Sequence, residues 1–459
     1  MFYFTPKYRP SRKPVFKVSH CSRSIGKSEY TFLILGLCLD RKLNQMPNPL
    51  ERIKKYHYCF SLLAVTLLTI WTYFWLEWRT FDGFVTAIDR GTQFMQDFVG
   101  HYYPMSIQIL QNPVPVTGYY YPSFFAILLS PIGKLSQTEA MTVWGIIQFV
   151  CFISLCIFPG HRLLKLDKKE MILFIGLCIS SYPILNNIKW GQVSIPITLC
   201  VLAALFLSDN NKPVLAGILL GLATAIKFYP ALFCVYFIFK RDLRALIAFG
   251  LATFVFYFAF PATILGFSGW LGFEKIILYD TSHTKFVTYD VNSQYFTHVA
   301  LRWFELFFSQ VPDAAFARVL KVLGYTIAAS CIAMAWLLTR KATSEKYNLP
   351  IAAIFLSLPF LLDTSWPHYF AYLPYCQTAI LAYIISRFRT SDIGFKILII
   401  LPAGSMLLSS IFLFNVFMNW SIYNTYGMLF LANLLLLSAI YAIIANQYHY
   451  FRLPNQVSQ

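Results

Sequence analysis

The sequence predicts an all-α protein that crosses a membrane many times, and three observations support this prediction. First, only 12% of the 459 residues are charged and 58% are hydrophobic, whereas soluble domains carry roughly 25% charged residues. Second, apolar runs recur that are long enough for a helix to cross the hydrocarbon core, which takes about 20 residues. Third, clusters of Lys and Arg separate several of these runs, as in the cytoplasmic loops of membrane proteins. We expect about 11 to 13 transmembrane helices in one domain.

The first run covers residues 57–77 and follows Arg52, Lys54 and Lys55, so its start is expected to face the cytoplasm. The loop at 78–118 is then extracytoplasmic. Further spans are expected near residues 119–135, 138–158, 171–188, 193–208, 348–362, 369–386, 395–416 and 427–445. The segment at 119–135 must be re-entrant or very short if the charged segment 161–170 is to stay in the cytoplasm.

The run at 217–241 is interrupted by Lys227 and Pro230. A proline cannot continue the hydrogen-bond ladder of a helix. An ionisable residue inside an apolar run is costly and usually functional. The pattern therefore predicts two short helices that meet at the sequence KFYP, near the outer face.

The net charge of +17 is explained by topology rather than by nucleic-acid binding. Residues 1–55 carry 12 Lys and Arg against 3 Asp and Glu, and no nucleic-acid motif accompanies them. We interpret 1–55 as a basic cytoplasmic tail, with Met46 as an alternative start, 56–446 as the membrane domain and 447–459 as a cytoplasmic tail. Most of the ten cysteines lie inside apolar runs without a CxxC pair, which favours buried thiols over disulfides or a metal site.

Unusual polar and aromatic side chains gather on the predicted outer side. The stretch FMQDFVGHYYPMSIQIL at 94–110 has the pattern of a short amphipathic helix that carries an acid. The outer residues that need an explanation are Asp97, His101, Tyr102 and Tyr103 in the first loop, Gln192, Lys227, Asn292, Ser293 and Gln294 further on, and Asp363, Trp366 and His368 near the C-terminal end.

Together these residues form a chemical set for sugar transfer. A carboxylate can act as general base on a hydroxyl, and a lysine can stabilise a phosphate leaving group. Amides and a histidine suit sugar hydroxyls. Each residue also has a simpler explanation: Asp97 as a solvated acid, Lys227 beside a phospholipid headgroup, Gln192 and Asn292 in helix caps or inter-helix hydrogen bonds, and His368 in an aromatic belt.

Five motifs then fall in order along the chain: QDFVGHYYP…GYYYPSFFAILLSP, WGQVSIPITLCVLAAL, LAGILLGLATAIKFYPALF…FKRDLRA, VNSQYF and SWPHYFAYLPY. In this order and spacing, from about residue 57 to about 445, they resemble the landmarks of glycosyltransferase family 87, the polyprenyl-phosphate-mannose-dependent α-mannosyltransferases of the GT-C fold. The resemblance implies a membrane enzyme that moves a hexose, with mannose as first candidate, from a polyprenyl monophosphate at the outer leaflet to a lipid or glycan acceptor, with inversion.

The resemblance also implies roles for single residues. Asp97 would be the general base and Lys227 a contact of the donor phosphate. The remaining residues implied in substrate binding are Gln192, Asn292, Ser293, Tyr102, Tyr103, Trp366 and His368. Tyr369 departs from the family, which has a second histidine there, and this leaves the sugar and the acceptor open. No metal or other cofactor is expected beyond the lipid-linked donor, because a phosphate leaves as a stable anion.

Two other classes compete with an enzyme. A transporter or lipid flippase would place polar residues at the bilayer midplane and contain inverted repeats, and the sequence contains no detectable repeat. A non-catalytic assembly protein would tolerate the loss of Asp97. Transfer of another sugar, such as glucose or an aminopentose, is an alternative within the enzyme class. We expect the cytoplasmic (inner) membrane of a bacterium, with the site facing outward.

Overall fold

A computed structural model describes residues 60–72, 94–283, 291–309, 314–341, 348–387, 393–417 and 420–449. Contacts divide the chain into two units, Met1–His57 and Tyr58–Gln459, and all described residues belong to the second. The predicted N-terminal tail, the alternative start at Met46 and most of the predicted C-terminal tail lie outside the described residues.

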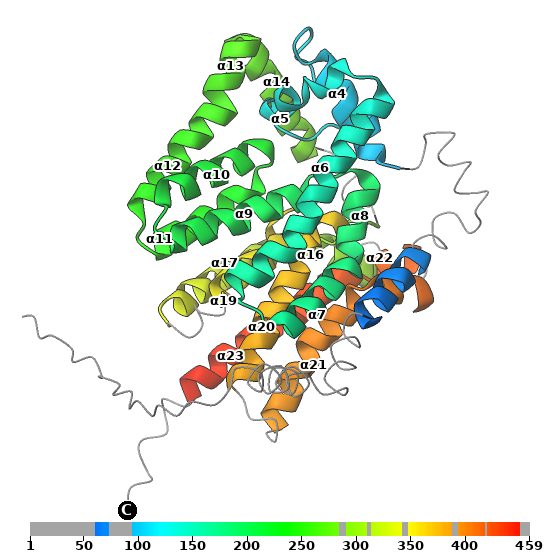
Figure 1. The fold of residues 1–459 in the computed structure, drawn as a ribbon, viewed down its shortest axis with the longest axis vertical. Helices are drawn as coiled ribbons and strands as arrows, with labels where there is room; N and C mark the ends of the chain where they lie inside the picture. The colour runs from blue at the N-terminus through cyan, green and yellow to red at the C-terminus, as the bar shows by residue number, and fades with distance from the viewer. Residues whose placement is uncertain are drawn as a thin grey trace, which may run out of the picture. The chain divides into compact units, whose positions relative to one another are not determined.

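The prediction of an all-α protein is confirmed in the described part of the chain, where the one extended pairing is an isolated antiparallel bridge between Ser181 and Ser410. The helices are labelled in Figure 1. The α-helices are α4 Tyr103–Gln108, α5 Ser123–Leu129, α6 Gln137–Phe158, α7 Lys168–Ile179, α8 Tyr182–Trp190, α9 Ser194–Asp209, α10 Pro213–Ile226, α11 Cys234–Phe239, α12 Leu243–Thr253, α13 Phe260–Leu265, α14 Phe267–His283, α16 Phe296–Phe308, α17 Ala314–Thr339, α19 Leu349–Leu361, α20 Leu373–Arg387, α21 Ile393–Leu408, α22 Trp420–Thr425 and α23 Met428–His449. The π-helical and 3₁₀ segments are η1 Phe98–Tyr102, η2 Ile132–Lys134, η3 Pro159–Leu163, η4 Tyr229–Phe233, η5 Phe254–Ala259, η6 Pro367–Tyr372 and η7 Leu413–Phe417.

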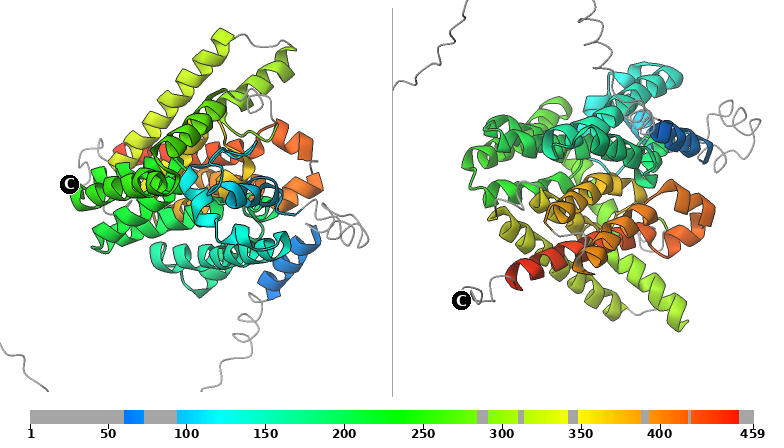
Figure 2. Two further views of the ribbon diagram at one scale, coloured as in Figure 1. Left: turned by 90° about the horizontal axis from the view of Figure 1, so that it is seen from above. Right: turned by 60° about the horizontal axis from the view of Figure 1, so that its bottom comes forward.

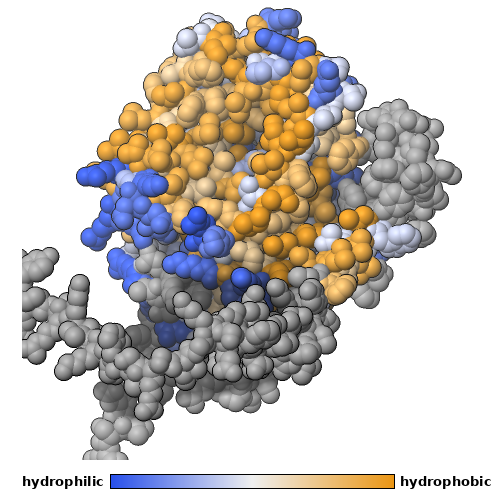
Figure 3. All heavy atoms as spheres, in the orientation of Figure 1, coloured by the Kyte–Doolittle hydropathy of each residue, from blue (hydrophilic) through white to orange (hydrophobic). Residues whose placement is uncertain are grey.

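Four helical segments among the described residues are long and apolar enough to cross a membrane. Six shorter apolar helices accompany them, and Figure 3 shows a face on which hydrophobic residues predominate. This is a polytopic membrane protein; the number of 11 to 13 spans stays a prediction. The four segments are Gln137–Leu163, Leu243–Leu265, Ala314–Thr339 and Met428–Asn446.

Small residues bring α10 and α12 into close contact. A Cβ added to Gly217 would come within 2.3 Å of the Ala245 carbonyl oxygen, and one added to Gly221 would lie 2.7 Å from the Ala252 Cβ. In helices surrounded by lipid, glycine and alanine allow backbones to approach and gain van der Waals contact. The two glycines therefore let α10 pack closely against α12. This packing positions α10, which ends at Ile226.

The structure divides one predicted run into two helices and agrees with the short length expected of another. The run at 171–188, which was expected near one span, consists of two helices, because α7 ends at Ile179 and α8 begins at Tyr182. Proline at the start of α8 has no N–H to continue the ladder. The segment around Ser410 satisfies the exposed backbone, with Tyr182 N bonded to Ser409 O at 2.9 Å.

The other segment is 119–135, which the sequence predicts as re-entrant or very short. Its one α-helix, α5, has 7 residues and so is about 10 Å long at 1.5 Å per residue. A helix of this length cannot cross the hydrocarbon core.

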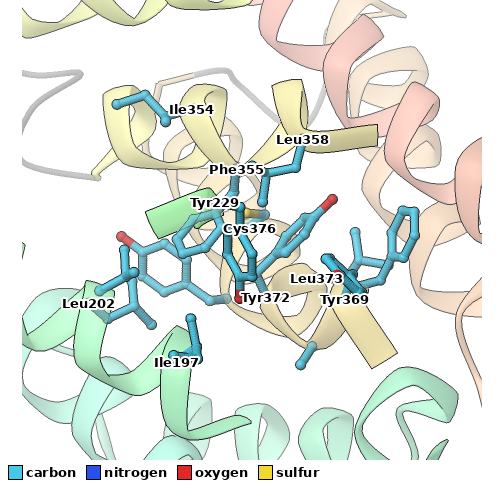
Figure 4. Packing of buried hydrophobic residues seen from close by; sticks show 14 of the residues in the cluster. Ile197, Leu202, Tyr229, Ile354, Phe355, Leu358, Tyr369, Tyr372, Leu373 and Cys376 are labelled. Carbon is cyan, nitrogen blue, oxygen red and sulfur yellow. The ribbon is translucent and has the colours of Figure 1, made fainter. Parts of the chain in front are cut away.

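Helix α19 forms the centre of the C-terminal half. All its residues from Leu349 to Phe360 are buried, as expected of a helix that is apolar on every side. Its Phe355 ring lies 5.0 Å from that of Tyr372 and 4.5 Å from that of Phe233, in the cluster drawn in Figure 4. The cluster extends to Tyr229 and Tyr369, whose rings are 5.6 Å apart, and so joins the core to the site described next.

Figures 1 and 2 show helices α9 to α13 and helices α19 to α23 on opposite sides of the described part of the chain. Helices α8 and α9 both pack against η6. As a result, polar residues at the ends of α8, α10 and η6 lie around one cavity.

Candidate active site

Asp97 stands at the start of a helix that is anchored by its apolar face. Phe98, Tyr102, Met105 and Ile109 are all buried, and their spacing of four, three and four residues places them on one side of a helix. The Phe98 ring stacks on Trp144 at 5.4 Å. The predicted amphipathic helix is therefore confirmed, and its buried face holds Asp97 at a cavity.

This cavity has a volume of about 720 Å³ and is the candidate active site. It receives side chains from η1, α8, the break after α10, the segment before α16 and the segment before η6. The outer residues singled out from the sequence that line it are Asp97, His101, Tyr102, Gln192, Lys227, Asn292, Asp363, Trp366 and His368.

Gln192 connects Asp97 to two tyrosines. Its Nε2 donates to Asp97 Oδ2, and its Oε1 lies 2.7 Å from the hydroxyls of Tyr102 and Tyr121. The two hydroxyls are 2.6 Å apart. Because the two tyrosine hydroxyls hold the oxygen of this amide, its N–H points at the Asp97 carboxylate in a defined direction.

The backbone around Gln192 explains why glycine precedes it. Gly191 ends α8 with a φ of 68°, a left-handed conformation that glycine adopts without steric cost. A Cβ at this position would lie 3.0 Å from the Phe98 Cβ, so only glycine fits without displacing the helix that carries Asp97. Trp144 Nε1 donates to the Gly191 carbonyl at 2.8 Å and locks the turn.

The electrostatic environment of Asp97 has opposing contributions. Burial raises the pKa of the Asp97 carboxyl above its ordinary value, since the charged form loses hydration. The hydrogen bond from Gln192 lowers this pKa, as do the nearby His101 and Lys227. The net result is a raised pKa, which suits a carboxylate that must accept a proton.

Lys227 lies in the break between α10 and η4, where the predicted pair of short helices meets. The side chain is 7% exposed. Its Nζ is 3.5 Å from the Tyr121 hydroxyl, its one hydrogen-bond partner among the described residues. The Nζ lies 3.7 Å from the centre of the Tyr369 ring and 5.1 Å from that of Tyr121. These rings hold the ammonium by cation–π attraction while most of its donors stay available.

Two further polar atoms in the cavity lining have no hydrogen-bond partner among the described residues. Trp366 Nε1 and His368 Nε2 are buried and form no hydrogen bond within the described residues. Both side chains line the cavity. A buried donor or acceptor without a partner costs about 1–3 kcal/mol, so a ligand that supplies partners would bind favourably here.

The remaining predicted residues take different places. Asn292 lines the cavity and accepts from Asn424 Nδ2 at 3.1 Å. Ser293 is buried outside it, with Oγ 2.7 Å from His298 Nδ1. Tyr103 donates to the Leu135 carbonyl at 2.8 Å and does not line the cavity. The substrate-binding roles of Ser293 and Tyr103 therefore remain predictions without a cavity contact.

Sequence reasoning missed several residues of the site. Tyr121 connects Gln192 and Lys227 yet is hidden within the tyrosine run at 119–121. Asn186 and Trp190 line the cavity from α8. For Asn186 the sequence offered a signal, because it is an amide inside an apolar run. Among the described residues no three His, Cys, Asp or Glu side chains are grouped to hold a metal ion, and the expected metal-free chemistry remains a prediction.

Comparison with known proteins identifies the family. Residues 119–362, more than half of the chain, match the model of glycosyltransferase family 87. A stretch of 152 residues is 29% identical to the polyprenol-phosphate-mannose-dependent alpha-(1-2)-phosphatidylinositol mannoside mannosyltransferase of Mycobacterium tuberculosis, covering 30% of this chain and 34% of that protein. A stretch of 68 residues is 38% identical to the protein of the same name from Mycolicibacterium smegmatis, covering 14% of each chain.

The chain thus matches about one third of the length of the first of these relatives and one seventh of the second. No solved structure gives a significant match. The family match includes Gln192 and Lys227 and ends before His368, and Asp97 lies ahead of it, so the cavity joins residues inside and outside the matched region. With more than half of its length matched, the chain belongs to glycosyltransferase family 87.

Proposed function

We propose that this enzyme transfers a hexose, with mannose as first candidate, from a polyprenyl monophosphate to a hydroxyl of a lipid or glycan acceptor. One observation carries the proposal: a half-buried acid and a buried lysine line the same cavity and are joined through Gln192 and Tyr121. The names of the two mycobacterial relatives, which specify polyprenol-phosphate-mannose as donor, support it.

In the proposed reaction, Asp97 accepts the proton of the acceptor hydroxyl as general base. The acceptor oxygen attacks the anomeric carbon, and the bond from this carbon to the phosphate oxygen breaks. Its electron pair stays on the phosphate, where Lys227 compensates the developing charge. Displacement in line with the leaving group inverts a β-linked donor to an α-glycoside. No general acid is needed, because the phosphate leaves as a stable anion.

The other cavity residues suit the sugar and the acceptor. Trp366 Nε1 and His368 Nε2 have unused hydrogen-bonding capacity, which sugar hydroxyls can fill. Asn292 and the aromatic ring of Tyr120 also line the cavity. We further propose that the cavity faces outward in a bacterial inner membrane, and that the reaction takes place without a metal ion.

An apolar groove beside the cavity fits the prenyl chain of such a donor. It has a volume of about 420 Å³ and shares Phe228, Tyr229, Leu361 and Leu362 with the cavity. Lys227 directly precedes the shared Phe228. A phosphate at Lys227 would therefore continue into a surface without charged side chains, lined also by Ala231, Leu232, Cys234, Val235 and Leu358.

Narrowing this groove is expected to select against long donors. In Val235→Trp the indole occupies the groove. Each buried methylene contributes about 0.8 kcal/mol, so excluding two or three of them raises the KM of a long-chain donor about 30-fold. Transfer from a short-chain donor that does not reach the groove should be unchanged. Leu251→Trp, on the exposed side of α12, is the control. Equal loss with both donors in Val235→Trp would contradict the assignment of the groove.

The pH dependence of transfer is expected to respond to Gln192. As a base, Asp97 works when deprotonated, so activity is present above its pKa and is lost as the pH falls through it. The hydrogen bond from Gln192 lowers this pKa. Gln192→Met removes the bond, raises the pKa and moves the acid limb of the kcat/KM profile to higher pH. Gln108→Met, which removes the hydrogen bond of a half-buried α4 glutamine to the Val114 carbonyl outside the cavity, should keep the wild-type limb. A limb unmoved in Gln192→Met would contradict the link.

The function itself is tested by sugar transfer in nanodiscs. Purified protein is incubated with radiolabelled polyprenyl-phosphate-mannose or -glucose and a membrane-lipid extract, and labelled products are separated. A labelled product from one donor supports the proposal and identifies sugar and acceptor together. Binding of both donors without any transfer, over a range of acceptor lipids and glycans, would favour a carrier over a transferase.

A further inference from the structure

A buried acid outside the cavity has no role in the reaction described above. Glu274 lies on α14 (Phe267–His283) and is only 3% exposed. Its Oε1 accepts from Ser123 N at 2.9 Å and from Ser123 Oγ at 2.7 Å, and its Oε2 accepts from the Tyr257 hydroxyl at 3.2 Å. Burial raises the pKa of Glu274, and these hydrogen bonds lower it.

Such a residue is costly to keep. A buried carboxylate loses several kcal/mol of hydration unless charges or hydrogen bonds compensate it. Within the described residues Glu274 forms hydrogen bonds but no ion pair. An amide or an apolar residue would be easier to bury at this position. The residues that Glu274 contacts therefore indicate what the acid does.

Two neighbouring residues of α14 contact one short segment, residues 119–123. Glu274 binds Ser123, and its neighbour Phe273 meets the Tyr119 ring edge-to-face at 6.1 Å. Ser123 is the first residue of α5, and its N–H has no acceptor inside that helix. Two adjacent residues of α14 thus hold both ends of a segment that is 151 positions away in sequence.

Tyr121 lies in the middle of this segment and connects the groups proposed for catalysis. Its hydroxyl is 2.7 Å from Gln192 Oε1 and 3.5 Å from Lys227 Nζ, and Gln192 in turn donates to Asp97. Tyr120 and Tyr121 also line the cavity. A displacement of the segment therefore moves the tyrosine that orients Gln192.

We infer that Glu274 is a positioning residue for the transfer: through Ser123 it holds residues 119–123 so that Tyr121 keeps Gln192 directed at Asp97. The inference rests on the proposed function. Glu274 does not itself line the cavity. Its effect on the site is therefore indirect and passes through Ser123. A merely structural role is the alternative, and it predicts lower stability with an unaltered site in the folded protein.

The test compares four variants as purified, monodisperse protein in nanodiscs. Glu274→Ala removes both contacts with Ser123, and Ser123→Ala removes the hydroxyl bond alone. Glu274→Gln keeps an oxygen that accepts both bonds from Ser123. Tyr257→Phe is the matched control, because it removes the bond to the other carboxylate oxygen and leaves Ser123 in place. The readouts are kcat, donor KM and the pH profile of sugar transfer.

We expect Glu274→Ala to lower kcat about ten-fold, the effect of losing one well-oriented interaction in the transition state, and to move the acid limb to higher pH as Gln192 releases Asp97. Glu274→Gln and Tyr257→Phe should keep the wild-type limb. Ser123→Ala should show the same displacement with a smaller loss, which keeps the test decisive if Glu274→Ala does not fold.

A double-mutant cycle separates positioning from stability. In the Gln192→Met background, adding Glu274→Ala or Ser123→Ala should cost little further activity, because the path through Gln192 is already lost. Additive losses with an unmoved acid limb would overturn the inference while leaving the proposed function intact. Absence of transfer by the wild type would instead refute the proposed function, so the two failures are distinguishable.

Discussion

Replacement of Asp97 by Asn is expected to abolish sugar transfer while donor binding is retained. Asparagine has the shape of aspartate but cannot accept a proton at neutral pH, and loss of a positioned general base costs about 10²–10⁴-fold in rate. Gln192 can still hydrogen-bond the asparagine oxygen, so the cavity should keep its form. The measurement is kcat in nanodiscs, together with equilibrium binding of the donor.

Asp363 provides the matched control for this substitution. It is the other acid that lines the cavity, but its carboxylate is 3.2 Å from Lys321 Nζ in an ion pair that is 43% exposed on both sides. Asp363→Asn should therefore retain most of the activity, since exposed ion pairs contribute at most about 1 kcal/mol. Undiminished transfer by Asp97→Asn would exclude Asp97 as the base.

Replacement of Lys227 by Met is expected to lower kcat/KM about 10²–10³-fold, the range observed when one donor to a developing anion is removed. Methionine keeps the length and the contact with the Tyr369 ring but carries no charge. The wild type should bind polyprenyl phosphate far more tightly than the uncharged polyprenol. Lys227→Met should lose this preference, which competition assays against the donor measure directly.

Lys227→Arg tests how closely the tyrosines enclose the ammonium. A guanidinium is broader than an ammonium, and the Tyr369 ring centre lies only 3.7 Å from Nζ, so we expect partial activity at most. Lys134→Met, an exposed lysine of η2, controls for net charge. Retention of the phosphate preference in Lys227→Met would place the donor phosphate elsewhere.

Much of the fold follows from local sequence. Apolar runs of sufficient length predict helices, and α6 agrees with the predicted span at 138–158 almost residue for residue. The interruption at Lys227 and Pro230 also appears where predicted, because proline acts on the helix that contains it. The break between α7 and α8 was not predicted, because the groups that stabilise it come from residues 409–411, more than 200 positions away.

Part of the site also follows from sequence. An acid beside an apolar helix face, and a lysine inside an apolar run, are both costly enough to indicate function. This reasoning found Asp97 and Lys227, which line one cavity together with His368. It could not find Tyr121, because a tyrosine is common in a membrane protein of this composition and its importance lies in its hydroxyl contacts.

The sequence by itself determined that the chain is helical, that it is a membrane protein and which charged residues are out of place in it. These properties depend on hydrophobicity and on backbone chemistry, which act over a few residues. Only the tertiary structure decided that Tyr121 connects Gln192 to Lys227, that Ser293 and Tyr103 lie away from the cavity, and that Glu274 accepts hydrogen bonds from Ser123. Such contacts depend on helix packing between distant segments, which no local pattern encodes.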